Sequence, residues 1–99
     1  MATVLVDAEN VRRSLWPNMS RDELAERAAA WGDANGHEVS LVWEGSESAD
    51  DRLAREVREL DGPVWVVTSD RELRERVSPY TERIVGGGSF ARELRGQRE

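Results

Sequence analysis

The chain has 99 residues and no cysteine, which excludes disulfide bonds and thiolate metal sites and leaves one small core to stabilise the fold. Its net charge of −6 at pH 7 argues against a general nucleic-acid coat protein, because such proteins are normally basic. No segment approaches the ~20 apolar residues of a membrane span, and the first residues lack the basic start of a signal peptide, so we expect a cytoplasmic protein without membrane contact.

The first half of the chain alternates between apolar runs and a helical pattern. Residues 3–6 form a short apolar run rich in β-branched side chains, as in a buried strand. After a loop at 16–18, Ser20 starts a Ser-Arg-Asp-Glu capping box, and the helix that it opens should end near Gly36. A second strand is predicted at 39–43.

The second half of the chain repeats this alternation. The predicted elements are a helix capped by Ser48, a strand at 64–67, a helix from Ser69 or Asp70 to about Val77, a strand at 84–85 and a terminal helix. We interpret the glycine run at 86–88 as a flexible turn rather than a phosphate-binding cradle, because neither a lysine nor the P-loop pattern accompanies it.

This order of elements predicts a single three-layer α/β domain over residues 1–99, with a short parallel sheet covered by helices on both faces. Because crossovers between parallel strands are right-handed, few topologies remain, and we predict about four strands in the order 2-1-3-4. The order places a topological switch point between the first and third strands. Open α/β sheets bind ligands there, at the carboxyl ends of the strands.

Acidic residues follow the predicted strands at this same edge. Asp7 ends the first strand, Asp70 follows the third, and Asp50 and Asp51 begin the helix after the second. Neighbouring strands lie about 4.8 Å apart, so Asp7 and Asp70 can share one ion. Crowded carboxylates repel, and Mg²⁺ or Mn²⁺ relieves that repulsion because both prefer carboxylate oxygen. The cluster suits metal-assisted attack of water on a phosphodiester.

Each of these acids also has an ordinary structural explanation. Asp7 can be a solvated strand end, and Asp70 can simply cap the helix that follows it. Asp50 and Asp51 are favoured in a first helical turn by the helix dipole. Ser69 is a helix cap or a support for an acid rather than a nucleophile.

Three residues near the first acid are candidates for contact with substrate. Arg12 and Arg13 can bind a phosphate, since guanidinium groups suit bidentate contacts, or can be solvated loop residues. Trp16 can stack on an unpaired base or cover the small core. The other three tryptophans are interpreted as core or half-buried residues. His37 lies at the wrong end of the sheet for this chemistry, so we interpret it as a surface residue.

Four short motifs occur along residues 3–95 in a fixed order. They are Val6-Asp7-Ala8-Glu9-Asn10, Ser48-Ala49-Asp50-Asp51, Val67-Thr68-Ser69-Asp70 and the terminal helix from Gly88 to Leu94. Together they resemble the NYN domain family, and in particular its YacP-like branch, within the PIN-like ribonuclease superfamily. The resemblance implies a PIN-like, Rossmannoid fold and a metal-dependent ribonuclease that acts on RNA.

The resemblance also implies roles for individual residues. Asp7, Asp70 and one or both of the paired aspartates would coordinate the metal, and Asn10 would brace the first acid or contact a metal-bound water. Glu72 is a weaker candidate for a further acid of the site.

Two departures from the family pattern concern Ala8 and Glu44. Ala8 replaces the usual glycine of the first motif. Glu44 stands where many relatives have an aspartate, so it either reaches the metal through its longer side chain or weakens that site. The chain is also short for the family.

Two functions from different classes follow. The first is a Mg²⁺- or Mn²⁺-dependent endoribonuclease, and the second is a non-catalytic NYN-type module that binds RNA or a protein. A receiver domain would need a lysine, which the chain lacks, and a haloacid-dehalogenase phosphatase would need two aspartates flanking one residue where this chain has Asp7-Ala8-Glu9. Four tryptophans in so small a domain are compatible with a homodimer.

Overall fold

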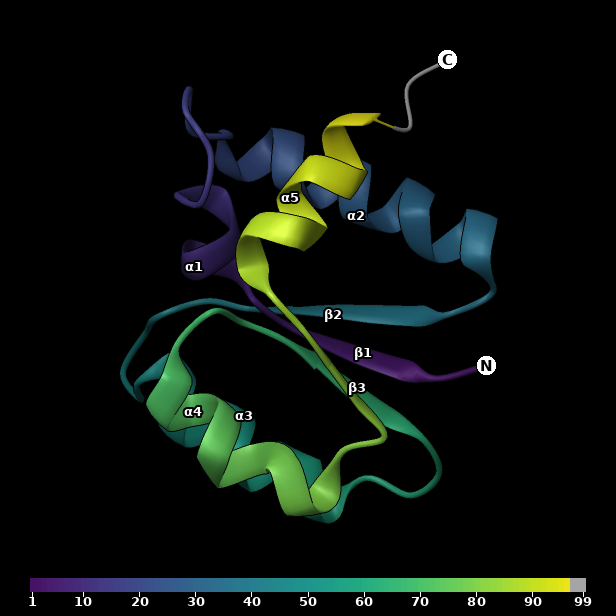
Figure 1. Cartoon of the computed structure of the whole chain (residues 1–99), viewed down its shortest axis with the longest axis vertical. Coiled ribbons are helices and arrows are strands. Elements are labelled where there is room, and N and C mark those ends of the chain that lie inside the picture. Colours follow the sequence, from purple (N-terminus) through teal and green to yellow (C-terminus); the bar gives the residue numbers. More distant parts are fainter. Residues whose placement is uncertain (97–99) are drawn as a thin grey trace.

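Four parallel strands form the central sheet of the computed structural model, which describes residues 1–96 (Figure 1). The strands are β1 (Thr3–Asp7), β2 (Glu38–Val42), β3 (Val64–Val67) and β4 (Arg83–Val85). Their spatial order is β2-β1-β3-β4, and β1 pairs with both β2 and β3. The predicted α/β fold and strand order are therefore confirmed, and each predicted strand matches the observed one to within a residue at either end.

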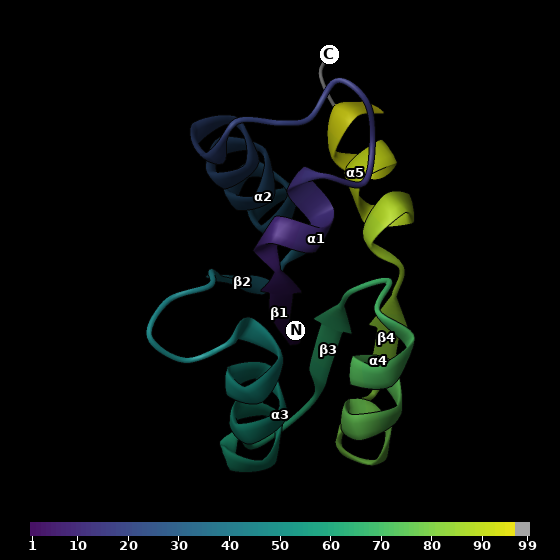
Figure 2. The ribbon, with the colours of Figure 1, turned by 90° about the vertical axis from the view of Figure 1, so that its left-hand side faces the viewer.

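Helices cover both faces of the sheet (Figures 1 and 2). On one face lie α1 (Ala8–Arg12), α2 (Arg21–Asn35) and α5 (Gly87–Gly96), and on the other α3 (Ala49–Glu59), α4 (Arg71–Val77) and the short 3-10 turn η1 (Ser78–Tyr80). Within residues 1–96, no helix combines the length and the apolar character needed to cross a membrane.

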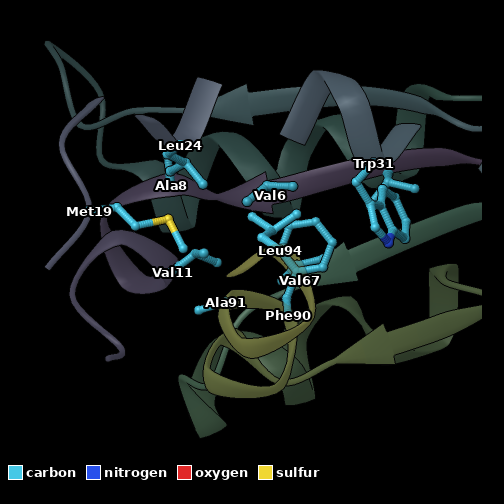
Figure 3. Packing of buried hydrophobic residues seen from close by; sticks show 11 residues of the cluster. Val6, Ala8, Val11, Met19, Leu24, Trp31, Val67, Phe90, Ala91 and Leu94 are labelled. Carbon is cyan, nitrogen blue, oxygen red and sulfur yellow. The ribbon is translucent and has the colours of Figure 1, made fainter. Parts of the chain in front are cut away.

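Two apolar cores sandwich the sheet because successive side chains of a strand point to opposite faces. Val4 and Val6 of β1 pack with Phe90 and Leu94 of α5 in the first core, whereas Leu5 packs in the second with α3 and α4. Figure 3 shows Val6 facing Phe90 and Leu94. Residues with buried apolar surface thus come from every layer and pack on both faces of the sheet.

Three helices begin at the polar residues that the sequence marks as caps. Ser20 Oγ accepts a hydrogen bond from the Glu23 amide at 3.0 Å, and Ser48 Oγ accepts one from the Asp51 amide at 3.1 Å. Asp70, rather than Ser69, caps α4. These side chains satisfy amides that have no partner inside their own helix.

Two predictions about local structure are wrong. The glycine run is not a flexible turn, because Gly87 and Gly88 are the first residues of α5. His37 is half-buried rather than a simple surface residue. Its ring centroid lies 5.6 Å from that of Trp31 and 4.5 Å from that of Trp65, and its Nδ1 accepts a hydrogen bond from the backbone of Ala2.

Candidate metal-binding active site

A cleft of about 440 Å³ opens at the carboxyl ends of β1, β2 and β3. In Figure 1 the chain leaves these three strands on the left-hand side of the molecule. The cleft is lined by Asp7, Glu9, Asn10, Arg13, Ser14, Glu44, Asp50 and Asp70. The structure therefore brings together three of the predicted acids and Glu44, although they come from segments far apart in the sequence.

Asp7 is the most buried of these acids, with only 6% of its surface exposed. It is the last residue of β1 and immediately precedes α1. Burial raises its pKa, and the nearby Asp50 and Glu44 carboxylates raise it further, whereas the Thr68 hydroxyl and the Asn10 backbone amide lower it. Thr68 Oγ1 donates to Asp7 Oδ2 at 2.9 Å and sets the orientation of the carboxylate.

Asp50 faces the same cleft from the first turn of α3 and is partly buried. Burial raises its pKa, and the Asp70 and Glu44 carboxylates add to the rise, while Arg76 opposes it. The shifts of Asp7 and Asp50 have the same origin, since both carboxylates are desolvated and lie near other negative charges. A cation in the cleft would relieve this repulsion.

Asp70 combines the two roles that the sequence left open. Its Oδ1 accepts a hydrogen bond from the Leu73 amide at 3.0 Å, which caps α4, and the residue also lines the cleft. Its own backbone amide donates to Thr68 Oγ1 at 3.1 Å. Thr68 therefore joins Asp70 to Asp7, because its hydroxyl group contacts both residues.

Two predicted acids, Asp51 and Glu72, lie outside the cleft lining. Asp51 is 63% exposed in its side chain and pairs with Arg76 at 3.3 Å. Successive residues of a helix point about 100° apart, so the side chains of Asp50 and Asp51 point in different directions, and of the two only Asp50 lines the cleft. Glu72 is exposed in the first turn of α4.

Asn10 supports Asp7 through its backbone amide, and its side chain holds a second group. The side-chain Oδ1 accepts a hydrogen bond from the Ser69 backbone amide at 3.0 Å. Ser69 Oγ in turn accepts one from the Gly87 amide at 2.8 Å. Through these bonds Asn10 and Ser69 connect α1, the loop after β3 and α5.

Glu9 is a cleft residue that the sequence interpretation missed. Its carboxylate pairs with Arg12 at 3.0 Å, with Arg13 at 3.2 Å and with Arg21 at 3.6 Å. Two of these pairs have the i,i+3 and i,i+4 spacing of a helix. A prediction of α1 from the sequence would have revealed these pairs, but a helix of five residues is too short to show a periodic pattern.

The candidate substrate residues differ in their exposure. Arg13 lines the cleft with 67% of its side chain exposed. Arg12 is mostly covered and donates to the backbone oxygen of Met19 at 3.2 Å, so it supports the loop rather than facing solvent. Trp16 is 87% exposed and is absent from the cleft lining, so the expectation that it covers the core is wrong.

The cleft suits a hard divalent cation, because the acidic side chains that line it offer carboxylate oxygens as metal ligands. As placed, no three His, Asp or Glu side chains among residues 1–96 form a group that could hold a metal ion. Mg²⁺ and Mn²⁺ need fewer direct protein ligands, because Mg²⁺ in particular keeps several waters and binds through one or two carboxylates. Asp7 and Asp70, with Asp50 facing them, are the residues that could hold such an ion.

A hollow of similar size, about 420 Å³, lies at the opposite edge of the sheet. It is lined by Met1, Ala29, Gly32, Asp33, His37, Glu38 and Val39. The polar groups there do not include a buried carboxylate, and this edge lies away from the switch point at which α/β sheets bind ligands. The acidic cleft is the better candidate.

Among solved structures, the chain is similar to Rae1 (YacP) from Bacillus subtilis. The two have a TM-score of 0.82 and are 21% identical, and the match covers 96% of this chain and 76% of that chain. No family profile and no curated protein matches this sequence. The likeness shows the fold, and it is the YacP-like fold that the four sequence motifs predict.

Proposed function

We propose that this protein is a Mg²⁺- or Mn²⁺-dependent endoribonuclease that hydrolyses phosphodiester bonds of RNA at the acidic cleft. One observation carries the proposal: Asp7, Asp50 and Asp70 reach one cleft from three separate elements, and two of them have a raised pKa. Negative charges that repel one another destabilise a fold, so they are typical of a site built for a cation. The resemblance to NYN domains and the YacP-like fold support RNA as the substrate.

The carboxylates would have different roles because their surroundings differ. Asp7, buried and oriented by Thr68, and Asp70, fixed at the start of α4, would hold the ion, and Asp50 would complete its negative surroundings. Glu44 is exposed at the rim, where its longer side chain can support the same ion. A bound cation would acidify a water molecule and offset the negative charge of the phosphate.

Two arginines that pair with the cleft residue Glu9, and an exposed tryptophan, would bind the RNA strand. Arg13 is exposed at the rim and is held there by Glu9, so its guanidinium is positioned to contact a phosphate. Arg21 pairs with the same Glu9 and lies 4.7 Å over the Trp43 ring. Trp16, largely exposed, offers a surface on which an unpaired base can stack.

The direct test is cleavage of labelled single-stranded and hairpin RNAs by the purified chain. We expect products with Mg²⁺ or Mn²⁺, loss of at least about a hundredfold in rate when EDTA is in excess, and recovery when Mn²⁺ is added back. A panel of RNAs that stays intact in saturating Mn²⁺ would refute the proposal.

A non-catalytic module that binds RNA or a protein is the second candidate. It is favoured by the lack, among residues 1–96, of three side chains already grouped around a metal position. Under this alternative the chain would bind RNA equally well in EDTA and in Mn²⁺ and would yield no product. Cytoplasmic location and homodimer formation remain predictions.

A further inference from the structure

We propose that Gly87 is a positioning residue for the acidic cleft, because its missing side chain leaves the space in which Asn10 reaches Ser69. We call these three residues the clasp. The inference rests on the proposed function, since it concerns how the carboxylates that would hold the cation are kept apart at a fixed distance.

The clasp is a continuous set of hydrogen bonds that joins α1, the loop after β3 and α5. Asn10 Oδ1 of α1 accepts a hydrogen bond from the Ser69 amide at 3.0 Å, and Ser69 Oγ accepts one from the Gly87 amide at 2.8 Å. The Gly87 amide belongs to the first turn of α5 and has no acceptor within its own helix, so Ser69 satisfies it from outside. Ser14 Oγ donates to the Asn10 backbone oxygen and secures the end of α1.

Two of the three clasp residues, Asn10 and Ser69, lie close along the chain to a cleft acid. Asn10 lies three residues after Asp7, and Ser69 lies between Thr68 and Asp70 in the chain. The bond from Asn10 to Ser69 therefore joins the end of β1 to the loop after β3. It adds to the Thr68 hydroxyl, which contacts both Asp7 and the Asp70 amide, and the two links together fix how far apart the two carboxylates lie.

Glycine is required at position 87 for space rather than for backbone conformation. A Cβ atom there would lie 2.1 Å from Asn10 Oδ1, 3.1 Å from Ser14 Oγ and 3.2 Å from Ser69 Oγ. The first distance is far inside van der Waals contact, so the Asn10 side chain would have to turn away and release the Ser69 amide. The backbone of Gly87 is not left-handed, and helix propensity alone would favour alanine.

The neighbouring Gly88 supplies a matched control. It also lies in the first turn of α5, but a Cβ atom there would meet only Arg92 Nη1, at an ordinary 3.8 Å. Gly88→Ala changes the same residue type in the same turn without touching the clasp. Any difference between the two variants therefore reports on the space around Asn10.

The experiment measures Mn²⁺ affinity by calorimetry, and urea unfolding, in the full chain and four variants. The variants are Gly87→Ala, Gly88→Ala, Asn10→Ala and the Asn10→Ala/Gly87→Ala double variant. We expect Gly87→Ala and Asn10→Ala each to weaken Mn²⁺ binding about tenfold, and Gly88→Ala to change it less than twofold. In the double variant the clash is gone, so stability should recover while Mn²⁺ binding stays weak.

If the double variant regains stability but still binds Mn²⁺ weakly, the weak binding reflects lost positioning of the cleft acids and not a poorly folded chain. Unchanged Mn²⁺ affinity in Gly87→Ala would overturn the inference, as would an effect of Gly87→Ala that is equally large when Asn10 is already alanine. If Gly87→Ala does not fold, the comparison between Asn10→Ala and the double variant decides, since their affinities must agree within twofold. A wild-type chain that binds no Mn²⁺ would instead refute the proposed function itself.

Discussion

Asp50→Asn is expected to lower the rate of metal-dependent RNA cleavage at least about a hundredfold, whereas Asp51→Asn should change it less than twofold. The two residues are adjacent in α3 and undergo the same chemical change. Asp50 faces the cleft close to the Asp70 and Glu44 carboxylates, while Asp51 is largely exposed and pairs with Arg76. Loss of charge should therefore matter at the first position only.

Single-turnover cleavage of one labelled RNA at saturating Mn²⁺ measures this difference. The Asp51–Arg76 pair is exposed, so its loss should change the free energy of unfolding by less than about 1 kcal/mol, and circular dichroism should find both variants folded. Equal losses of rate in the two variants would contradict the assignment of Asp50 to the cleft chemistry. A large loss in Asp51→Asn alone would reverse it.

Asp7→Asn is expected to stabilise the metal-free protein at neutral pH while abolishing its stabilisation by Mg²⁺. The pKa of Asp7 is raised above its ordinary value of 3.8 in the folded state, chiefly by burial. A raised acid pKa means that ionisation is less favourable in the folded chain than in the unfolded chain. The stability that protonated Asp7 adds to the folded state is therefore complete below pH 3.8, the ordinary pKa. It is lost as the pH rises through the raised pKa of the folded state.

The amide of asparagine carries no charge, and its oxygen can still accept the Thr68 hydrogen bond. We expect a gain of about 1 kcal/mol in EDTA at pH 7, or roughly 4–8 °C in Tm for a domain of this size. Urea unfolding at pH 4 and pH 7 checks the sign, because the gain should shrink at the lower pH. Asp33→Asn, an exposed change away from the cleft, serves as the control. A metal-free Asp7→Asn protein that is less stable than wild type at pH 7 would contradict this expectation.

The strands and their order could be predicted because their residues obey simple rules. Val64–Val67 is apolar throughout, as expected of a strand buried on both faces, and right-handed crossovers restrict where the other strands can lie. The polar residues that cap α2, α3 and α4 were equally readable, since each precedes a helical pattern. Convergence of Asp7 and Asp70 at one edge follows from the strand order alone.

The remaining features depend on side-chain direction and on contacts between distant segments. The sequence could not distinguish Asp50 from Asp51, because the choice depends on the rotation of α3 about its axis. Gly87 looked like part of a flexible run, because its contact with Asn10 joins residues at opposite ends of the chain. His37 looked exposed for the same reason, since its two tryptophan neighbours come from α2 and β3.

The most direct test of the central claim is anomalous diffraction from crystals of the full chain soaked in Mn²⁺. We predict a peak in the acidic cleft, about 2.0–2.3 Å from at least one carboxylate oxygen of Asp7 or Asp70, that disappears in Asp70→Asn crystals soaked in the same way. An empty cleft at saturating Mn²⁺, with any bound ions confined to other surfaces, would contradict the claim that these carboxylates converge to hold a cation.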